Sequence, residues 1–294
     1  MVDTITPAVA TARRPLVGRV VLGAVLLAVC WPVYWQVAGS VGRLGFFGTW
    51  LGYVVIADAL VLRRTGTSPL TRAGWRYAGV FALSVPFWWA YEGLNLLTGN
   101  WTYAPTNWDR SPTWALLYSL DFATVLPALF VTAELARSFR RTGAPRPVGG
   151  QVGEPGRIPG PVLRALPAAV LPVLVVLAVW PNEAYPLLWL VLFLLLDPVN
   201  ALAGRPSLLA DAAHRRWGLL VTLGAAALVC GFFWEMWNSR SALVWAYHVP
   251  GLDGTAHLFA MPVVGYLGYI PFMWSAYASY QALQQPLRLP PLVA

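Results

Sequence analysis

Lysine is absent from the 294 residues of this sequence. Retinal proteins hold their chromophore through a lysine Schiff base, and some enzymes use lysine as a covalent nucleophile, so both classes are excluded. The basic residues behind the net charge of +8 are therefore all arginines. Because they stand between apolar segments, membrane topology explains them better than nucleic-acid binding does.

Cysteine, histidine and charged residues are also scarce. Charged residues make up 11% of the chain, whereas a soluble domain has about 25%. Cys30 and Cys230 both lie in apolar segments, so we expect buried thiols and no disulfide. The three histidines show no metal-ligand spacing, and the sequence has no phosphate loop, nucleophile elbow, dinucleotide fingerprint or HExxH motif. We therefore expect no metal and no other cofactor.

Long hydrophobic runs, in contrast, recur along the whole chain, which is 58% hydrophobic. A run of about 20 apolar residues is long enough to cross the hydrocarbon core of a bilayer as a helix. The sequence predicts an all-α integral membrane protein with eight transmembrane helices. We expect these spans at 18–38, 46–63, 76–98, 114–136, 161–181, 184–203, 217–238 and 256–280.

The arginines predict the orientation of the spans. Most of them precede the first span, follow every second span, or surround the segment 139–160; only Arg43, Arg110 and Arg240 fall on the other side. The positive-inside rule then places both termini in the cytoplasm of a bacterium, with the spans in its inner membrane. The segment 139–160 is rich in Gly, Pro and Arg, which predicts a flexible cytoplasmic linker.

An internal repeat is indicated by five features that recur in the same order at a nearly constant offset. The matched features are Trp31-Pro32 and Trp180-Pro181, Trp50 with Asp58 and Trp189 with Asp197, Glu92 with Asn95 and Glu235 with Asn238, Trp101-Thr-Tyr103 and Trp245-Ala-Tyr247, and Pro127 and Pro271. We expect two tandem four-helix repeats, 1–138 and 161–294, joined by the linker. Such parallel repeats leave a natural cavity between the halves.

Acidic side chains inside the spans are the first candidates for function. A carboxylate in the hydrocarbon region costs about 2.5–3.5 kcal/mol on insertion scales, so each one should face protein or water. Glu92 shares a helix face with Asn95, and Glu235 shares one with Asn238; both pairs fall at the outer ends of their spans, as does Asp121. Asp58 and Asp197 lie toward the cytoplasmic ends and form secondary polar sites. Alternatively, a Glu and an Asn at a helix end can simply bond to a neighbouring helix.

Tryptophan is unusually frequent, with 16 residues, and most of these fit interfacial belts. Trp88, Trp89, Trp234 and Trp237, however, surround the glutamates on the same helices. Apolar surroundings favour a protonated carboxyl, and aromatic faces stabilise a cation by about 0.5–2 kcal/mol. An acid with aromatic walls is what isoprenoid cyclisation requires, although the same walls suit passive binding of a lipid or polyene. The outer loops 99–113 and 239–255 add Tyr103 and Tyr247 near the same mouth.

Part of the second half resembles an uncharacterised family of bacterial multi-pass membrane proteins. The resemblance is good over 232–275 and weaker over 80–130. It rests on Phe232-Phe-Trp-Glu-Met-Trp-Asn238, Trp245-x-Tyr247-x-x-Pro250, Phe259-Ala-Met-Pro262 and Gly265-Tyr-Leu-Gly-Tyr-Ile-Pro-Phe272. The family pattern has acidic residues where this chain has Ala260 and Ser275, so a role of those acids does not carry over.

The first half is more distantly similar to the integral-membrane lycopene (carotenoid) cyclases. The similar run is Trp88-Trp-Ala-Tyr-Glu92-x-x-Asn95-x-x-x-Gly99-x-Trp101-x-Tyr103. The paired glutamates that follow a proline in those cyclases are not found here. Trp234-Glu235 also resembles the Trp-Glu elements of the membrane meroterpenoid cyclases, which use two essential acids. These similarities imply acid-catalysed cyclisation of an isoprenoid without a cofactor.

Three functions remain open from the sequence. In an isoprenoid or carotenoid cyclase-like enzyme, Glu92 and Glu235 would be the acids and Asp121 a supporting acid or base. Asn95 and Asn238 would orient the substrate, and the tryptophans and tyrosines named above would line its path. In a proton-coupled transporter or lipid-handling protein, Asp58 and Asp197 would matter more. A non-catalytic pigment- or lipid-binding subunit would need only the aromatic cavity. All three imply the bilayer and a hydrophobic, lipid-like ligand as partners.

Overall fold

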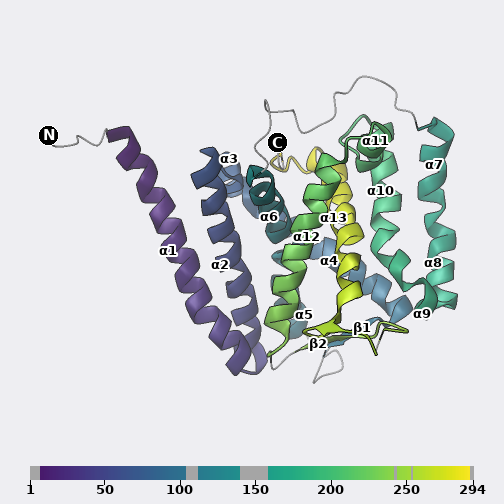
Figure 1. The fold of residues 1–294 in the computed structure, drawn as a ribbon, viewed down its shortest axis with the longest axis horizontal. Coiled ribbons are helices and arrows are strands. Elements are labelled where there is room, and N and C mark those ends of the chain that lie inside the picture. The colour runs from purple at the N-terminus through teal and green to yellow at the C-terminus, as the bar shows by residue number, and fades with distance from the viewer. Residues whose placement is uncertain (1–6, 104–111, 140–157, 242–243, 253, 292–294) are drawn as a thin grey trace.

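The protein is a bundle of α-helices that lie side by side (Figure 1). The computed structural model describes residues 7–103, 112–139, 158–241, 244–252 and 254–291, with side chains from Leu16 onward. Most of the expected linker 139–160 falls outside the described residues. The α-helices are α1 Pro7–Gln36, α2 Gly39–Thr65, α3 Pro69–Ala73, α4 Ala78–Thr98, α5 Pro112–Ala123, α6 Val125–Phe139, α7 Gly160–Ala168, α8 Val170–Val179, α9 Pro181–Ala184, α10 Val191–Leu202, α11 Leu208–Ala213, α12 Trp217–Asn238 and α13 Tyr269–Gln284.

Short 3-10 helices and strands connect these α-helices. The 3-10 helices are η1 Gly74–Tyr77, η2 Tyr185–Leu190 and η3 Val263–Gly268. The strands are β1 Trp101–Tyr103, β2 Trp245–Tyr247, β3 His257–Leu258 and β4 Met261–Pro262. Strands β1 and β2 pair antiparallel, with Trp101 opposite Tyr247, and β3 pairs with β4. The β1–β2 pair lies at the end of the bundle opposite to the start of α1 (Figure 1).

The prediction of an all-α protein is confirmed. Six helical stretches in the described part of the chain are long and apolar enough to cross a membrane, which supports the prediction of a multi-pass membrane protein. They are Leu16–Gln36, Gly39–Thr65, Pro112–Phe139, Gly160–Val179, Pro181–Leu202 and Trp217–Asn238.

The other two expected spans, 76–98 and 256–280, are not among these six. Helix α4 covers most of the first, but its tryptophans, Glu92 and Asn95 lower its mean hydropathy. The second expectation is wrong about where the helix begins: residues 257–268 form β3, β4 and η3, so α13 starts only at Tyr269. Its 16 residues measure about 24 Å, less than the thickness of the hydrocarbon core.

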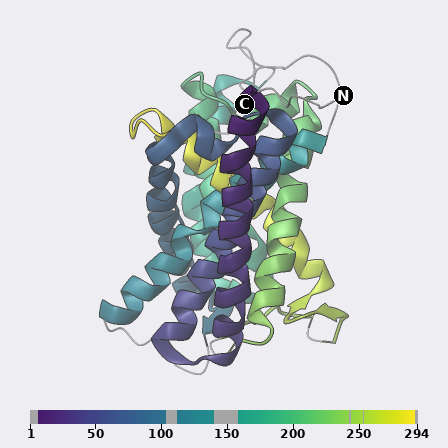
Figure 2. The same ribbon diagram turned by 90° about the vertical axis from the view of Figure 1, so that its left-hand side faces the viewer.

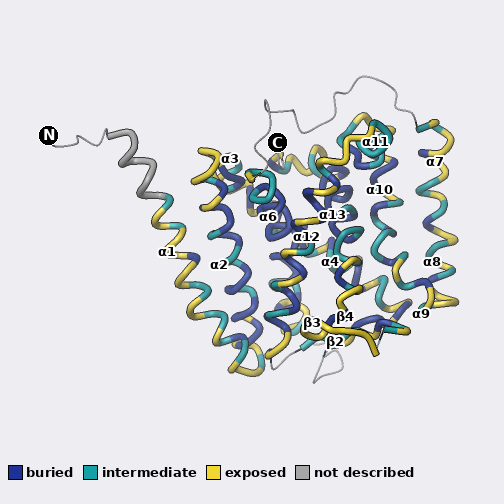
Figure 3. Tube along the Cα trace, viewed as in Figure 1, coloured by how far each residue is buried: buried dark blue, intermediate teal, exposed yellow. Residues whose placement is uncertain are grey.

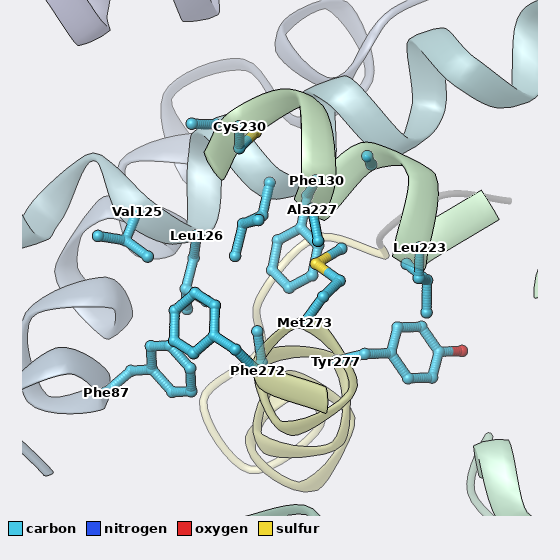
Figure 4. Packing of buried hydrophobic residues seen from close by; sticks show 14 of the residues in the cluster. Phe87, Val125, Leu126, Phe130, Leu223, Ala227, Cys230, Phe272, Met273 and Tyr277 are labelled. Carbon is cyan, nitrogen blue, oxygen red and sulfur yellow. The ribbon is translucent and has the colours of Figure 1, made fainter. Parts of the chain in front are cut away.

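The core of the bundle lies among α2, α4, α6, α10, α12 and α13, where burial is concentrated (Figure 3). Phe130, Met273 and Tyr277 pack there between α6, α12 and α13 (Figure 4). Both cysteines are free thiols, as expected. Cys230 is buried in the same layer, whereas Cys30 is only partly buried, which corrects the expectation of two buried thiols.

Helix α1 stands at one side of the bundle, in front of it in Figure 2, and packs mainly against α2. Small residues allow this close contact: a Cβ on Gly48 would clash with Cys30 Sγ, and a Cβ on Gly52 would lie 2.9 Å from the carbonyl oxygen of Gly23. Close approach through small residues is typical of helix pairs in membranes. The outer face of α1 exposes apolar side chains such as Val21 and Val25, as a lipid-facing helix does.

Candidate functional site

A cavity of about 410 Å³ lies beside the β1–β2 pair, within the size range of small-molecule sites. Its walls come from α2, α4, α5, α6, α12, α13, η2, η3 and the strands β1, β2 and β4, and most of the lining side chains are aromatic or aliphatic. Among the lining residues are Arg43, Phe46, Trp88, Asn100, Trp101, Tyr103, Asp121, Phe122, Trp189, Trp234, Trp245, Tyr247, His248, Tyr269 and Phe272.

The aromatic walls are built from rings that pack on one another. Trp101 stacks on Trp189 with ring centroids 5.6 Å apart, and Trp234 stacks on Tyr269 at 5.8 Å. Phe272 contacts Trp88 edge-on at 5.6 Å. Such contacts contribute about 0.5–1.5 kcal/mol per pair beyond area burial, so they give the cavity a defined shape.

One ion pair interrupts this apolar lining. Arg43 Nε from α2 lies 3.2 Å from Asp121 Oδ2 of α5, with both side chains buried. The guanidinium carbon of Arg43 also lies 4.2 Å from the ring centroid of Tyr118. Within the described residues, neither carboxylate oxygen of Asp121 accepts a hydrogen bond. A buried charge that is incompletely paired is costly, and in a membrane protein such groups are concentrated at functional sites.

Glu92 lies behind the wall of this cavity. Its Oε1 accepts hydrogen bonds from Trp88 Nε1 (2.8 Å), Trp101 Nε1 (3.2 Å) and the Tyr103 hydroxyl (2.5 Å). These three donors line the cavity, whereas Glu92 is not among the lining residues that the structure describes. Burial, together with the nearby Glu92 carboxyl, raises the pKa of Tyr103 well above its ordinary value, so the phenol remains a donor.

Glu235 likewise lies behind residues that line the cavity. Its Oε1 accepts hydrogen bonds from the hydroxyls of Tyr269 (2.6 Å) and Tyr247 (3.0 Å), and both phenols line the cavity. Burial and the charge of Glu235 raise the pKa of Tyr247 well above its ordinary value. Glu235 is fully buried, and in the described part of the chain its Oε2 has no hydrogen-bond partner. Each glutamate therefore holds aromatic rings of the wall in place.

The two asparagines are predicted to bind substrate, but in the structure they form hydrogen bonds with the backbone instead. Asn95 Nδ2 donates to the Trp101 carbonyl (2.8 Å), and Trp101 N donates to Asn95 Oδ1 (3.3 Å). Asn238 makes the same two bonds to Trp245, at 2.7 and 2.8 Å. Each asparagine thus ties the end of a long helix to the strand that follows it and keeps that strand at the cavity.

The structure divides the four predicted tryptophans into two groups. Trp88 and Trp234 line the cavity, as do Tyr103 and Tyr247. Trp89 instead donates from Nε1 to Ser119 Oγ at 3.0 Å. Trp237 packs edge-on against Trp50, with centroids 4.7 Å apart, in the core beside α2.

Asp58 and Asp197 lie at the opposite end of the bundle and organise the loops there. Asp58 accepts from Leu70 N (2.9 Å), and also from Ser68 Oγ (2.9 Å) and Arg19 Nη1 (2.6 Å). Asp197 accepts from Ser207 Oγ (2.7 Å), Leu208 N (2.9 Å) and Leu209 N (2.9 Å). Both carboxylates therefore stabilise the start of a short helix, α3 or α11, and neither lines the cavity among the described residues.

Sequence reasoning missed several lining residues, above all Arg43. The sequence does contain a feature that points to Arg43 as a site residue, because this arginine interrupts an otherwise apolar segment that runs to Asp58. The repeat includes Trp189 and the family pattern includes Tyr269, but neither pattern places its residue at a cavity. In the described residues, no group of three or more His, Cys, Asp or Glu side chains is placed to hold a metal ion.

No family model, no curated protein and no solved structure matches this chain.

Proposed function

We propose that the chain has eight spans in two tandem four-helix repeats, 1–138 and 161–294, with both termini in the bacterial cytoplasm. The matched contacts of the two glutamates, the two asparagines and the two aspartates support the repeat. The strand pairing supports it too, because Trp101 lies opposite Tyr247 while Tyr103 lies opposite Trp245, as a twofold axis between the strands requires. Arginines such as Arg64 and Arg205, which follow spans at the end where α1 begins, support the orientation.

We further propose that the cavity is the active site of a cofactor-independent isoprenoid or carotenoid cyclase-like enzyme of the isomerase class. The observation that carries this proposal is the Asp121–Arg43 pair: both residues line an aromatic cavity, and the carboxylate oxygens of Asp121 are buried and accept no hydrogen bond in the described structure. A passive apolar pocket gains nothing from a buried charge, whereas a proton donor must reach its substrate.

The reaction uses one proton and returns it. Asp121 first takes up a proton from solvent, which converts its carboxylate in the ion pair into a neutral carboxyl. It then adds this proton to a carbon–carbon double bond, and a second double bond of the same substrate molecule attacks the resulting carbocation to close a ring. The faces of Trp101, Trp189 and Trp234 stabilise the cation. Loss of a proton to the Asp121 carboxylate then gives a cyclic isomer. Arg43 stabilises that carboxylate while it is charged.

The two glutamates and two asparagines act as positioning residues in this proposal. Glu92 and Glu235 fix the indole and phenol groups of the wall, and Asn95 and Asn238 fix the strands that carry them. Glu92 and Glu235 remain candidates for the acid itself, and substitution separates the roles. A glutamine keeps an acceptor for the aromatic donors but cannot deliver a proton.

The test is cyclisation in lipid nanodiscs supplied with linear isoprenoids, namely an acyclic carotenoid and C15–C20 polyene alcohols. The expected product has the mass of the substrate, one double bond fewer and, in D2O, one deuterium. Asp121→Asn should lower the rate at which it forms by about 10²–10⁴-fold. The proposal fails if no polyene is cyclised, or if Asp121→Asn is as active as the unchanged protein.

Passive binding of a pigment or lipid is the second candidate, favoured by the nearly continuous apolar lining of the cavity. A binding subunit would purify with a polyene or lipid in unchanged chemical form. Mass spectrometry of the organic extract from the purified protein, before and after incubation at 37 °C, distinguishes a stable ligand from a converted one.

A further inference from the structure

The cavity is open at one side, and the residues at this opening are apolar. Val264 and Leu267 of η3 line the cavity and are nevertheless 56% and 59% exposed. Pro186 of η2 also lines the cavity and is exposed. Helices η2 and η3 meet beside this opening, because a Cβ on Gly268 would lie 3.4 Å from Trp189 Nε1.

The surface around this opening is apolar as well. Leu258 and Phe259 are exposed large hydrophobic residues, and Leu258 pairs in the β3–β4 hairpin with Met261, which lines the cavity. A mouth that faced water would have a polar rim, because contiguous exposed apolar surface is unfavourable there. His248, which follows β2, also lines the cavity and is exposed, but unlike Val264 and Leu267 it is polar.

We propose that Pro186, Val264 and Leu267 frame a lateral portal through which an apolar, lipid-like molecule enters the cavity from the bilayer. The inference rests on the proposed function in one respect, the apolar nature of the ligand. Such a molecule dissolves in the bilayer, with about 0.8 kcal/mol gained per buried CH₂, so entry through water would be slow. Inside the portal it meets Trp189 and Gly268, where the missing side chain of the glycine leaves room beside the indole.

The test measures occupancy of the cavity and not turnover. A linear C15 isoprenoid alcohol bearing a benzophenone group is incorporated into vesicles, mixed with the protein in nanodiscs, and irradiated at successive times. Peptide mass spectrometry then follows adducts on Trp189 and Tyr269. Val264→Trp and, as a second variant, Leu267→Trp should slow adduct formation by about tenfold by narrowing the portal. Val263→Trp is the matched control, because Val263 is similarly exposed, at 52%, but does not line the cavity among the described residues.

The outcomes separate this proposal from the cyclase proposal. The portal proposal is overturned if both portal variants are labelled as fast as the protein without substitutions, or if Val263→Trp slows labelling as much as they do. It is also overturned if the protein without substitutions forms no cavity adduct. If His248→Trp alone slows labelling, the ligand enters from water and the portal is again overturned. If labelling depends on the portal while no polyene is cyclised, the portal stands and only the cyclase proposal fails. Equal thermal unfolding temperatures of the variants exclude loss of the fold as the cause.

Discussion

Arg43 Nε lies 3.2 Å from Asp121 Oδ2, and the two side chains are only 3% and 5% exposed. They come from α2 and α5, which are separated in sequence by the whole of α4. Moving such a pair out of water is costly, and the one short contact between them leaves the Asp121 oxygens without hydrogen-bond donors in the described structure. The pair is therefore the polar feature of the cavity that packing alone does not explain.

Breaking this ion pair should destabilise the protein more than removing both charges. Arg43→Met leaves Asp121 buried and unpaired, for which we expect a loss of about 3–5 kcal/mol in unfolding free energy. Combining Arg43→Met with Asp121→Leu should recover most of that loss. Unfolding in mixed micelles measures both effects, with Arg240→Met, an exposed arginine at the same end, as the control. A double variant no more stable than Arg43→Met contradicts this account.

Activity should separate the proton donor from the positioning acids. Asp121→Asn should lower the cyclisation rate by about 10²–10⁴-fold, the usual contribution of a general acid. Glu92→Gln and Glu235→Gln should remain within about tenfold of the unchanged protein, because a glutamine oxygen still accepts from the aromatic donors. Initial rates in nanodiscs give the comparison. The opposite order, with either glutamine variant inactive and Asp121→Asn active, would assign the acid to that glutamate.

The Glu235 carboxyl should matter for stability through its tyrosines. Glu235→Leu leaves the hydroxyls of Tyr247 and Tyr269 without their acceptor, which costs about 1–3 kcal/mol for each buried group left unsatisfied. The double variant Glu235→Leu with Tyr269→Phe should lose less unfolding free energy than the sum of the losses in the two single variants. A double-mutant cycle on unfolding free energies measures this coupling, and strict additivity would show that the hydrogen bond contributes nothing.

The aspartates at the far end should be structural. Asp197→Ala removes the acceptor for Ser207 Oγ, Leu208 N and Leu209 N at the start of α11, so we expect a stability loss of about 1–3 kcal/mol. Cyclisation and ligand labelling should stay unchanged below the unfolding temperature. A proteoliposome assay can contradict this prediction. A proton-driven flux that disappears in Asp58→Asn and Asp197→Asn would identify a transporter instead.

The membrane architecture could be predicted from the sequence because it depends on local quantities. A bilayer sets the length of an apolar helix, so composition and run length revealed most of the spans without tertiary information. The boundary expected at 256 is wrong for a local reason as well. The apolar residues from Met261 to Gly268 predict a helix, but they form β4 and η3, and hydrophobicity does not distinguish these states.

The candidate site was predicted only in part. Helical spacing placed Glu92 with Asn95 and Glu235 with Asn238. Of the aromatic residues predicted around them, Trp88, Trp234, Tyr103 and Tyr247 line one cavity, whereas Trp89 and Trp237 do not. Spacing fixes which side chains share a face of one helix, since 3.6 residues complete a turn. It does not fix how that helix is rotated toward its neighbours. Only the packing of α2 against α5 places Arg43 beside Asp121 at the cavity wall. Both glutamates lie behind that wall, where they accept hydrogen bonds from its aromatic residues. Buried donors and acceptors must pair, and here their partners come from elements distant in the chain.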